Sequence, residues 1–278
     1  MFRQGRAGVL DETTGHGNGG NGSDMKDCDG ERLPAGGGMR GDMNAIAIIT
    51  ARGGSRRIPG KNKKEFLGRP ILCYPIEAAL SSGLFEEVMV STDDEKIAKL
   101  AREAGAQVPF LRSEATSGDY ATTDDVLMEV LEEYEKRGRA FAYMACLYPT
   151  APFVTAEKLK HAMELLVDQN ASGVMPVLRY SFPPQRGMAI REGRLEYCYP
   201  ENYMKRSQDL EPMYYDSGQF YCYRTDRYRA CRGILEDGYV PYILPELEAQ
   251  DIDNPSDWEL AELKYRIMKD GARRQCEK

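Results

Sequence analysis

Residues 45–62 read AIAIITARGGSRRIPGKN, and this stretch decides the fold. Its first part, Ala45–Thr50, is a short apolar run of the kind that forms a buried strand. The second part combines two adjacent glycines with four basic side chains, Arg52, Arg56, Arg57 and Lys61. Ligands of open α/β sheets bind beyond the carboxyl ends of the strands, so the loop stands where an anion would be expected.

Outward from this stretch, apolar runs alternate with segments of helical periodicity. The expected strands cover residues 87–91, 141–147, 173–179 and 240–244, and the expected helices cover 70–82, 94–104, 125–137, 155–169 and 255–269. Such alternation predicts parallel βαβ units with right-handed crossovers. The expected architecture is therefore a three-layer α/β/α sandwich of Rossmann type.

Two segments depart from this alternation. Residues 1–42 hold 12 of the 27 glycines and few large apolar side chains. They cannot offset their ordering entropy by burial and are predicted to form a disordered tail, ahead of one domain over 43–278. The sequence is compatible with a native extension and with an artificial one. Residues 180–235 are rich in tyrosine and carry a hairpin signal at Glu192-Gly193, which predicts a small β-rich arm suited to homodimer formation.

Composition excludes several classes of protein. The chain of 278 residues has a hydrophobic fraction of 42%, enough for a sizeable core, and a net charge of −7, which disfavours nucleic acid as a partner. Its 7 cysteines are scattered and form no C-x-x-C pair, so neither a zinc site nor a disulfide framework is expected. No apolar run is long enough for a membrane span. The simplest interpretation is a reducing, cytoplasmic compartment.

The basic loop has the chemistry of a triphosphate site. Gly53 and Gly54 let the backbone approach an anion closely, and the basic side chains supply charge-assisted donors. The loop is not a Walker A loop, because Asn62 rather than Ser or Thr follows Lys61, and it lacks the G-x-G-x-x-G spacing of dinucleotide sites. The alternative is a basic surface turn.

A second candidate site is Asp251-Ile252-Asp253. If this segment is extended, residues two apart face the same side, so both carboxylates can converge on one hard cation. Mg²⁺ is the expected metal, because it accepts one or two carboxylates together with waters and phosphate oxygens. The alternative is a pair of aspartates that only precedes the helix beginning near Pro255.

Several ordered motifs then support a family resemblance. Beyond the loop, they are Val90-Ser91-Thr92-Asp93-Asp94, Pro109-Phe110-Leu111-Arg112-Ser113, Tyr148-Pro149-Thr150-Ala151-Pro152, Ser181-Phe182-Pro183-Pro184-Gln185-Arg186, Tyr215-Asp216-Ser217-Gly218-Gln219-Phe220 and Asp251-Ile252-Asp253. Over residues 43–269 the chain resembles the cytidylyltransferases that activate nine-carbon acidic sugars, the CMP-sialic acid synthetase family, and most of all its pseudaminic acid branch. The resemblance implies a fold of the nucleotide-diphospho-sugar transferase type.

The resemblance also implies roles for individual residues. Arg52, Gly53, Gly54, Ser55, Arg56 and Lys61 would hold the phosphates of CTP, and Asn62, Asp93, Arg112 and Thr123 would complete the nucleotide site. Lys61 and Arg52 would stabilise charge on the α-phosphate, and Asp251 or a metal-bound hydroxide would act as the general base. Arg112 could instead form a surface salt bridge, and Asp93 and Thr123 could instead cap helices.

The implied reaction transfers CMP from CTP to the anomeric hydroxyl of a nonulosonic acid and releases pyrophosphate. The acceptor side would comprise Tyr148, Ser181, Phe182, Gln185, Arg186, Tyr215 and Gln219. Sialic acid enzymes tend to have Gln in place of Tyr148 and Arg near Tyr215, so two tyrosines favour the less polar pseudaminic acid. N-acetylneuraminic and legionaminic acids remain alternatives, and a non-catalytic nucleotide-sugar sensor is the alternative of another class.

Overall fold

A mixed β-sheet forms the centre of the domain. The computed structural model describes residues 43–55, 57–118, 120–231, 233, 235 and 238–276, so the predicted tail over 1–42 lies outside the described residues. Within them, the central sheet has 7 strands. In spatial order its main path is β11 (Val240–Ile243), β6 (Gly173–Arg179), β10 (Phe220–Arg224), β5 (Tyr143–Leu147), β1 (Ala45–Thr50) and β4 (Glu87–Ser91), and β9 (Tyr214–Asp216) pairs with β6.

The strand directions differ in part from the expected parallel arrangement. Strands β4, β1 and β5 are parallel, and β11 is parallel to β6. Strand β10 is antiparallel to both β5 and β6, and β9 is antiparallel to β6. Both antiparallel strands come from the tyrosine-rich region that the sequence assigned to the arm. Residues 220–223 are all buried, so these aromatic side chains serve the core of the sheet rather than a protruding element.

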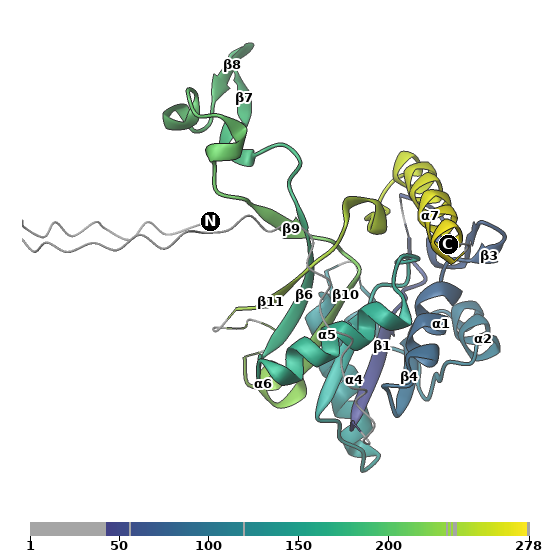
Figure 1. Ribbon diagram of the computed structural model, residues 1–278. Helices are drawn as coiled ribbons and strands as arrows, with labels where there is room; N and C mark the ends of the chain where they lie inside the picture. Colours follow the sequence, from purple (N-terminus) through teal and green to yellow (C-terminus); the bar gives the residue numbers. More distant parts are fainter. Residues whose placement is uncertain are drawn as a thin grey trace, which may run out of the picture. The chain divides into compact units, whose positions relative to one another are not determined.

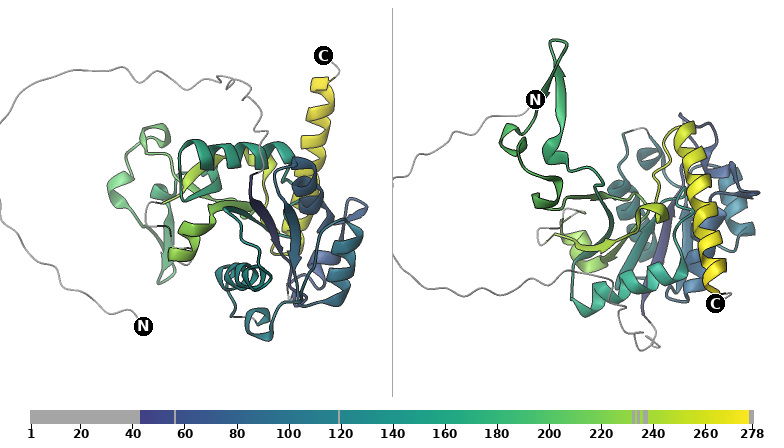
Figure 2. Two further views of the ribbon diagram at one scale, coloured as in Figure 1. Left: turned by 90° about the horizontal axis from the view of Figure 1, so that it is seen from below. Right: turned by 45° about the horizontal axis from the view of Figure 1, so that its top comes forward.

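Helices cover both faces of the sheet, as Figures 1 and 2 show. On one face, α1 (Cys73–Ser82), α2 (Glu95–Glu103) and α5 (Ala156–Asp168) pack against a core that includes Ala47 and Ile49. On the other face, α4 (Thr123–Lys136) and α6 (Thr225–Cys231) pack against a core that includes Ile46 and Ile48. This alternation along β1 confirms the expected three-layer sandwich.

Side chains at the helix starts fix where several helices begin. Thr155 caps α5 as expected. Asp94, not Asp93, caps α2 by accepting from the N–H groups of Lys96 and Ile97, and Thr122, not Thr123, caps α4 in a capping box with Asp125. The cap alternatives for Asp93 and Thr123 are therefore wrong by one residue.

The pairing of two short strands makes α1 shorter than the helix predicted from the sequence. Helix α1 begins at Cys73 rather than at Pro70, because β3 (Arg69–Pro70) pairs with β2 (Glu65–Phe66). The short helix α3 (Glu114–Ser117) precedes α4.

The final helix, α7 (Pro255–Cys276), closes an aromatic core beside the sheet. Trp258 and Tyr265 pack edge-to-face on Phe66 with ring centroids 5.6 Å apart in both pairs. Ile58 from the basic loop and Ile252 from the aspartate segment are buried in the same cluster. Burial of each isoleucine contributes about 2 kcal/mol, so this shared core holds the two predicted site segments together.

The arm is smaller than the sequence indicated. It contains the hairpin of β7 (Met188–Arg191) and β8 (Arg194–Tyr197), whose turn at Glu192 and Gly193 has the positive φ values typical of a two-residue hairpin loop. The hairpin projects away from the central sheet, as Figure 1 and the right view of Figure 2 show. Among the described helices, none has the length and apolar character that a membrane crossing requires.

Candidate functional site: a cavity at the carboxyl ends of β1 and β5

The basic loop after β1 is built closely onto its neighbours. The Gly53 N–H donates to Asp93 Oδ1 at 2.7 Å. A Cβ at Gly53 would lie 2.9 Å from Asp94 Cβ, whereas a Cβ at Gly54 would meet no atom within 4 Å. Gly53 is therefore required by packing inside the protein, while Gly54 leaves its side of the backbone open to a ligand.

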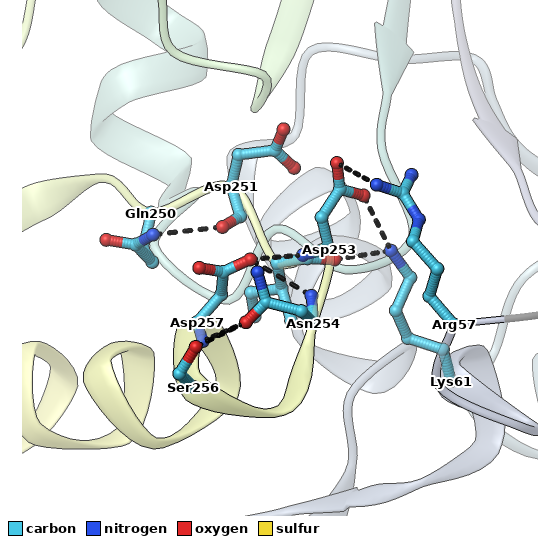
Figure 3. A network of polar contacts seen from close by, with 9 residues as sticks. Arg57, Lys61, Gln250, Asp251, Asp253, Asn254, Ser256 and Asp257 are labelled. Atoms are coloured by element: carbon cyan, nitrogen blue, oxygen red, sulfur yellow. Dashed lines mark hydrogen bonds and ion pairs between the residues drawn. The ribbon is translucent and has the colours of Figure 1, made fainter. Parts of the chain in front are cut away.

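Two basic residues reach from this loop to the aspartate segment, as Figure 3 shows. Lys61 Nζ donates to the Ile252 carbonyl oxygen and lies 3.8 Å from Asp253 Oδ1, and Arg57 donates to Asp253 Oδ2 at 2.8 Å. Burial lowers the pKa of Lys61, and the carboxylates of Asp253 and Asp251 act against that shift. A partly buried ammonium group interacts more strongly with a nearby anion than one in water does.

In the aspartate segment, the surroundings of Asp251 disfavour its negatively charged form. Burial raises the pKa of Asp251, and the nearby charge of Asp253 raises it further. The turn after the segment is fixed by Asp257, which accepts from the N–H groups of Asp253 at 2.9 Å and Asn254 at 3.0 Å. Asp257 is thus occupied with the start of α7. Of the two aspartates before it, Asp253 contacts Arg57 and Lys61, so a cation at this pair would share the Asp253 carboxylate with those two side chains.

Loop and aspartate segment face each other across one cavity of about 690 Å³, a size typical of a small-molecule site. Residues expected from the sequence supply part of its wall: Arg52, Ser55, Lys61, Asn62, Arg112, Thr123, Tyr148, Asp251 and Asp253. The other lining residues are Thr50, Arg57, Ala121, Thr122, Val126, Pro149 and Thr150. The predicted phosphate residue Arg56 lies outside the described residues.

Arg112 lines the same cavity and is held by hydrogen bonds to the end of β4. Arg112 donates to the hydroxyl of Ser91 at 3.1 Å and to the Ser91 carbonyl at 2.8 Å, in place of the surface salt bridge considered from the sequence. Burial lowers the pKa of Arg112, but a guanidinium stays protonated at neutral pH. Burial raises the pKa of Tyr148, and the nearby Thr123 side chain acts against that shift.

Two expected nucleotide residues have structural contacts of their own. Asn62 is buried and donates to the Arg52 carbonyl at 2.9 Å, which fixes the shape of the loop. Asp93 does not line the cavity; its carboxylate accepts from Gly53 and thereby positions the loop.

Most of the expected acceptor residues lie elsewhere, around the base of the arm. Ser181 lines a second cavity of about 480 Å³, together with Tyr180, Pro183, Ser207, Gln208 and four other residues, whereas Phe182 is 62% exposed. Gln185 donates to the Glu211 carbonyl and Arg186 to the Ser207 hydroxyl. Only Tyr148 among the acceptor residues lines the larger cavity.

The remaining two predicted acceptor residues, Tyr215 and Gln219, contact other residues of the protein. The Tyr215 ring packs against the Tyr180 ring at 4.7 Å. Gln219 is 1% exposed and donates to the carbonyls of Ser217 at 3.3 Å and Gln250 at 3.2 Å. Gln219 therefore supports the segment before Asp251 instead of facing a ligand.

The donor set fits Mg²⁺ bound together with phosphate oxygens. Among the described residues, no group of three or more His, Cys, Asp or Glu side chains could hold a metal alone. Mg²⁺ normally uses one or two carboxylates and completes its octahedron with water and substrate oxygens. Asp251 and Asp253 provide that pair in the cavity. Burial and, next to it, the charge of Asp253 raise the pKa of Asp251, and a bound cation would stabilise the ionised carboxylate.

Comparison with known proteins agrees with this chemistry. A sequence profile described as cytidylyltransferase matches residues 46–193, the part of the chain that contains the basic loop, Arg112 and Tyr148. The chain belongs to the cytidylyltransferase family. Its resemblance to this family, expected from the motifs, is thereby confirmed.

Two curated relatives of this cytidylyltransferase are similar over most of its length. Pseudaminic acid cytidylyltransferase from Campylobacter jejuni subsp. jejuni is 35% identical over 237 residues, which cover 83% of this chain and 100% of the relative. CMP-N,N'-diacetyllegionaminic acid synthase from Legionella pneumophila is 33% identical over 230 residues, which cover 79% of this chain and 95% of the relative.

Solved structures confirm the fold of the cytidylyltransferase. A CMP:2-keto-3-deoxy-manno-octonic acid synthetase complexed with CTP matches with a TM-score of 0.57 at 17% identity, and the match covers 81% of this chain and 99% of that chain. A 4-diphosphocytidyl-2C-methyl-D-erythritol synthase from Anaerococcus prevotii matches with a TM-score of 0.54 at 14% identity, covering 80% of this chain and 98% of that chain.

Proposed function

We propose that this cytidylyltransferase transfers CMP from CTP to the anomeric hydroxyl of a nonulosonic acid, with pseudaminic acid as the acceptor, and releases pyrophosphate. The proposal rests mainly on the cavity of about 690 Å³, in which the basic loop after β1 faces Asp251 and Asp253. The names of the two curated relatives favour a nonulosonic acid, and the greater identity belongs to the pseudaminic acid enzyme.

The loop would bind the triphosphate. Arg52, Ser55 and Lys61 line the cavity and would donate to phosphate oxygens, with Lys61 nearest the α-phosphate. Arg56, Gly53 and Gly54 would complete this part of the site. Arg112, Thr123 and Asn62 would contact the cytosine and ribose. Because the groups are already positioned before the reaction, their charges stabilise the transition state without further reorganisation. Loss of Lys61 would cost about 3 kcal/mol in the transition state.

Asp251 and Asp253 would hold Mg²⁺ against the phosphates. The bound ion would neutralise negative charge on the triphosphate. Arg57 and Lys61 contact Asp253 and would keep its carboxylate aimed at the cavity. Asp251 would also accept the proton of the attacking hydroxyl.

The acceptor sugar would lie against Tyr148, the acceptor residue that lines the nucleotide cavity. Ser181, Phe182, Gln185, Arg186 and Tyr215, grouped near the base of the arm, would complete its site. The two tyrosines offer wide contact area with few charged atoms, which suits a deoxy, di-N-acetylated sugar.

We also propose that the chain forms a cytoplasmic homodimer through the arm. On its hairpin, Ile190 is 76% exposed and Leu195 is 66% exposed, an unusual amount of apolar surface for a two-stranded element. Light scattering after size-exclusion chromatography measures the molar mass in solution and so tests for the dimer. Ile190→Asp should lower this mass from that of a dimer towards that of a monomer. Arg191→Asp, on the same hairpin, should not change it. A wild type of monomer mass at micromolar concentration would contradict the dimer.

The function is tested by pyrophosphate release with CTP and Mg²⁺ and with pseudaminic, legionaminic or N-acetylneuraminic acid as acceptor. Release with pseudaminic acid is expected to exceed the other two at least tenfold in kcat/KM, about 1.4 kcal/mol of discrimination. Lys61→Met should slow release by about a hundredfold, which corresponds to about 3 kcal/mol. Lys99→Met changes an exposed lysine on α2 and should leave release unchanged. Greater release with another sugar would refute the acceptor assignment, and CTP binding without turnover would favour the nucleotide-sugar sensor.

A further inference from the structure

Two basic side chains already contact the Asp253 carboxylate, one at each of its oxygens. Arg57 donates to Asp253 Oδ2 at 2.8 Å, and Lys61 Nζ lies 3.8 Å from Asp253 Oδ1 (Figure 3). A divalent cation bound to either oxygen would lie within a few ångströms of one of these positive groups and would be repelled by it. A cation at this carboxylate therefore competes with Arg57 or with Lys61.

The two side chains differ in how firmly the protein holds them. Lys61 has only 18% of its side chain exposed and also donates to the Ile252 carbonyl oxygen. Arg57 has 69% of its side chain exposed, and an ion pair as exposed as the one it forms with Asp253 is weak. A cation that competes for Asp253 therefore displaces Arg57 more easily than Lys61.

Arg57 has a second possible partner in the same cavity. It lines the wall together with Arg52, Ser55 and Lys61, which are the side chains proposed to contact the triphosphate. The family resemblance gave Arg57 no role. A guanidinium presents its N–H donors in a planar fork that matches two oxygens of a carboxylate or two oxygens of a phosphate equally well. One side chain can thus serve Asp253 first and a phosphate afterwards.

We propose that Arg57 is the counter-ion of Asp253 until the nucleotide binds, and then exchanges this carboxylate for a phosphate of the nucleotide as a divalent cation takes its place. Arg57 thus opposes binding of the cation alone and favours binding of the cation together with CTP. The inference rests on the proposed function, which supplies the triphosphate. The competition between Arg57 and a cation at Asp253 is a property of the protein alone.

Three variants and one control test the exchange. Arg57→Gln removes the positive charge, whereas Arg57→Lys keeps the charge without the planar fork. Asp253→Asn removes the carboxylate for which Arg57 and the cation compete. Arg69→Gln is the matched control, because Arg69 forms an ion pair of the same kind with Glu77 at 2.7 Å, has 50% of its side chain exposed and lines neither cavity described above.

The affinity of the full chain for Mn²⁺, a paramagnetic substitute for Mg²⁺, is measured first, without nucleotide, by electron paramagnetic resonance. Arg57→Gln should bind Mn²⁺ about fivefold more tightly than the wild type, the effect of removing one unit charge a few ångströms from the ion. Arg57→Lys and Arg69→Gln should stay within about twofold of the wild type, because they keep the charge beside Asp253. Asp253→Asn should bind Mn²⁺ about tenfold more weakly, because one of two carboxylates is lost.

Calorimetry of CTP binding at saturating Mg²⁺, without an acceptor sugar, measures the second half of the exchange. Arg57→Gln should weaken the affinity for CTP about tenfold, the effect of one lost hydrogen bond to a charged group, and Arg69→Gln should leave it unchanged. A residue that only supported the loop would weaken both ligands when it is replaced. Tighter binding of Mn²⁺ together with weaker binding of CTP is therefore specific to an exchange.

The two measurements separate this inference from the proposed function. If Arg57→Gln binds Mn²⁺ no more tightly than Arg69→Gln, or if Asp253→Asn binds it as well as the wild type, Arg57 does not compete with a cation at Asp253 and the proposal is wrong. If Mn²⁺ binds more tightly to Arg57→Gln but its affinity for CTP equals that of the wild type, the exchange for a phosphate is wrong. If the wild type binds CTP but releases no pyrophosphate with any sugar, the proposed function fails, whereas both affinities still decide the role of Arg57.

Discussion

Gly53→Ala provides the sharpest test of how the basic loop is held. The new methyl group would lie 2.9 Å from Asp94 Cβ and 3.2 Å from Asp94 Oδ2. Asp94 cannot retreat freely, because its carboxylate caps α2 through the N–H groups of Lys96 and Ile97 and pairs with Lys63 at 2.6 Å. Gly53 cannot retreat either without stretching its 2.7 Å hydrogen bond to Asp93.

The expected cost follows from these contacts. Overpacking of this kind costs about 1–3 kcal/mol, and loss of a helix cap or of one hydrogen bond adds about 1 kcal/mol. The sum is roughly 2–4 kcal/mol. For a domain of this size each kcal/mol lowers Tm by about 2–4 °C, so Gly53→Ala should lower Tm by roughly 4–16 °C.

Thermal unfolding followed by circular dichroism, without ligands, measures this effect. Gly54→Ala is the matched control, because its methyl group meets no protein atom within 4 Å. Its Tm should stay within about 2 °C of wild type, whereas its affinity for CTP, measured by calorimetry, should fall at least fivefold if phosphates approach this backbone. Equal Tm values for Gly53→Ala and wild type would refute the packing argument, and unchanged CTP affinity of Gly54→Ala would refute the close approach of the ligand.

Two further predictions concern the start of α4 and the buried thiols. Thr122→Ala removes the cap of α4 and should lower the free energy of unfolding by about 1 kcal/mol in urea titration, whereas Thr123→Ala should leave it unchanged and weaken CTP binding instead; equal losses would contradict the cap assignment. Burial raises the pKa of Cys146 to about 12 and also raises the pKa of Cys222. Between pH 7 and 9, a thiol reagent should therefore label exposed Cys198 in the native protein. It should label Cys146 and Cys222 only after the protein has been unfolded. Peptide mapping by mass spectrometry would expose early labelling of Cys146, which would contradict the structure.

The sequence predicts those parts of the site whose residues lie close together in the chain. An apolar run followed by a glycine-rich basic loop places Arg52, Ser55 and Lys61 at the end of a strand, and the structure does line its larger cavity with them. Asp251 and Asp253 join the same cavity because Ile252 between them is buried in the core that also holds Ile58. An extended stretch with one buried residue between two carboxylates is a pattern that sequence periodicity can indicate.

What the sequence could not indicate depends on contacts between distant residues. Arg57 belongs to the same basic loop, but its ion pair with Asp253 spans 196 positions and has no local signal. Gln219 is polar and was assigned to the sugar, yet it is buried because the segment before Asp251 needs a donor for the Gln250 carbonyl. The aromatic residues of β10 were assigned to the arm, because tyrosine marks interfaces and buried strands alike until the partners of its hydroxyl are known.

A crystal structure of the protein with CTP and Mg²⁺ would show directly whether the larger cavity binds the nucleotide in this way. We expect the triphosphate to contact Arg52, Ser55 and Lys61, and the base to lie beside Arg112. The ion should lie between the phosphates and the carboxylates of Asp251 and Asp253. A nucleotide bound in the smaller cavity beside Ser181, or one bound in the larger cavity with its phosphates away from the loop, would contradict this arrangement.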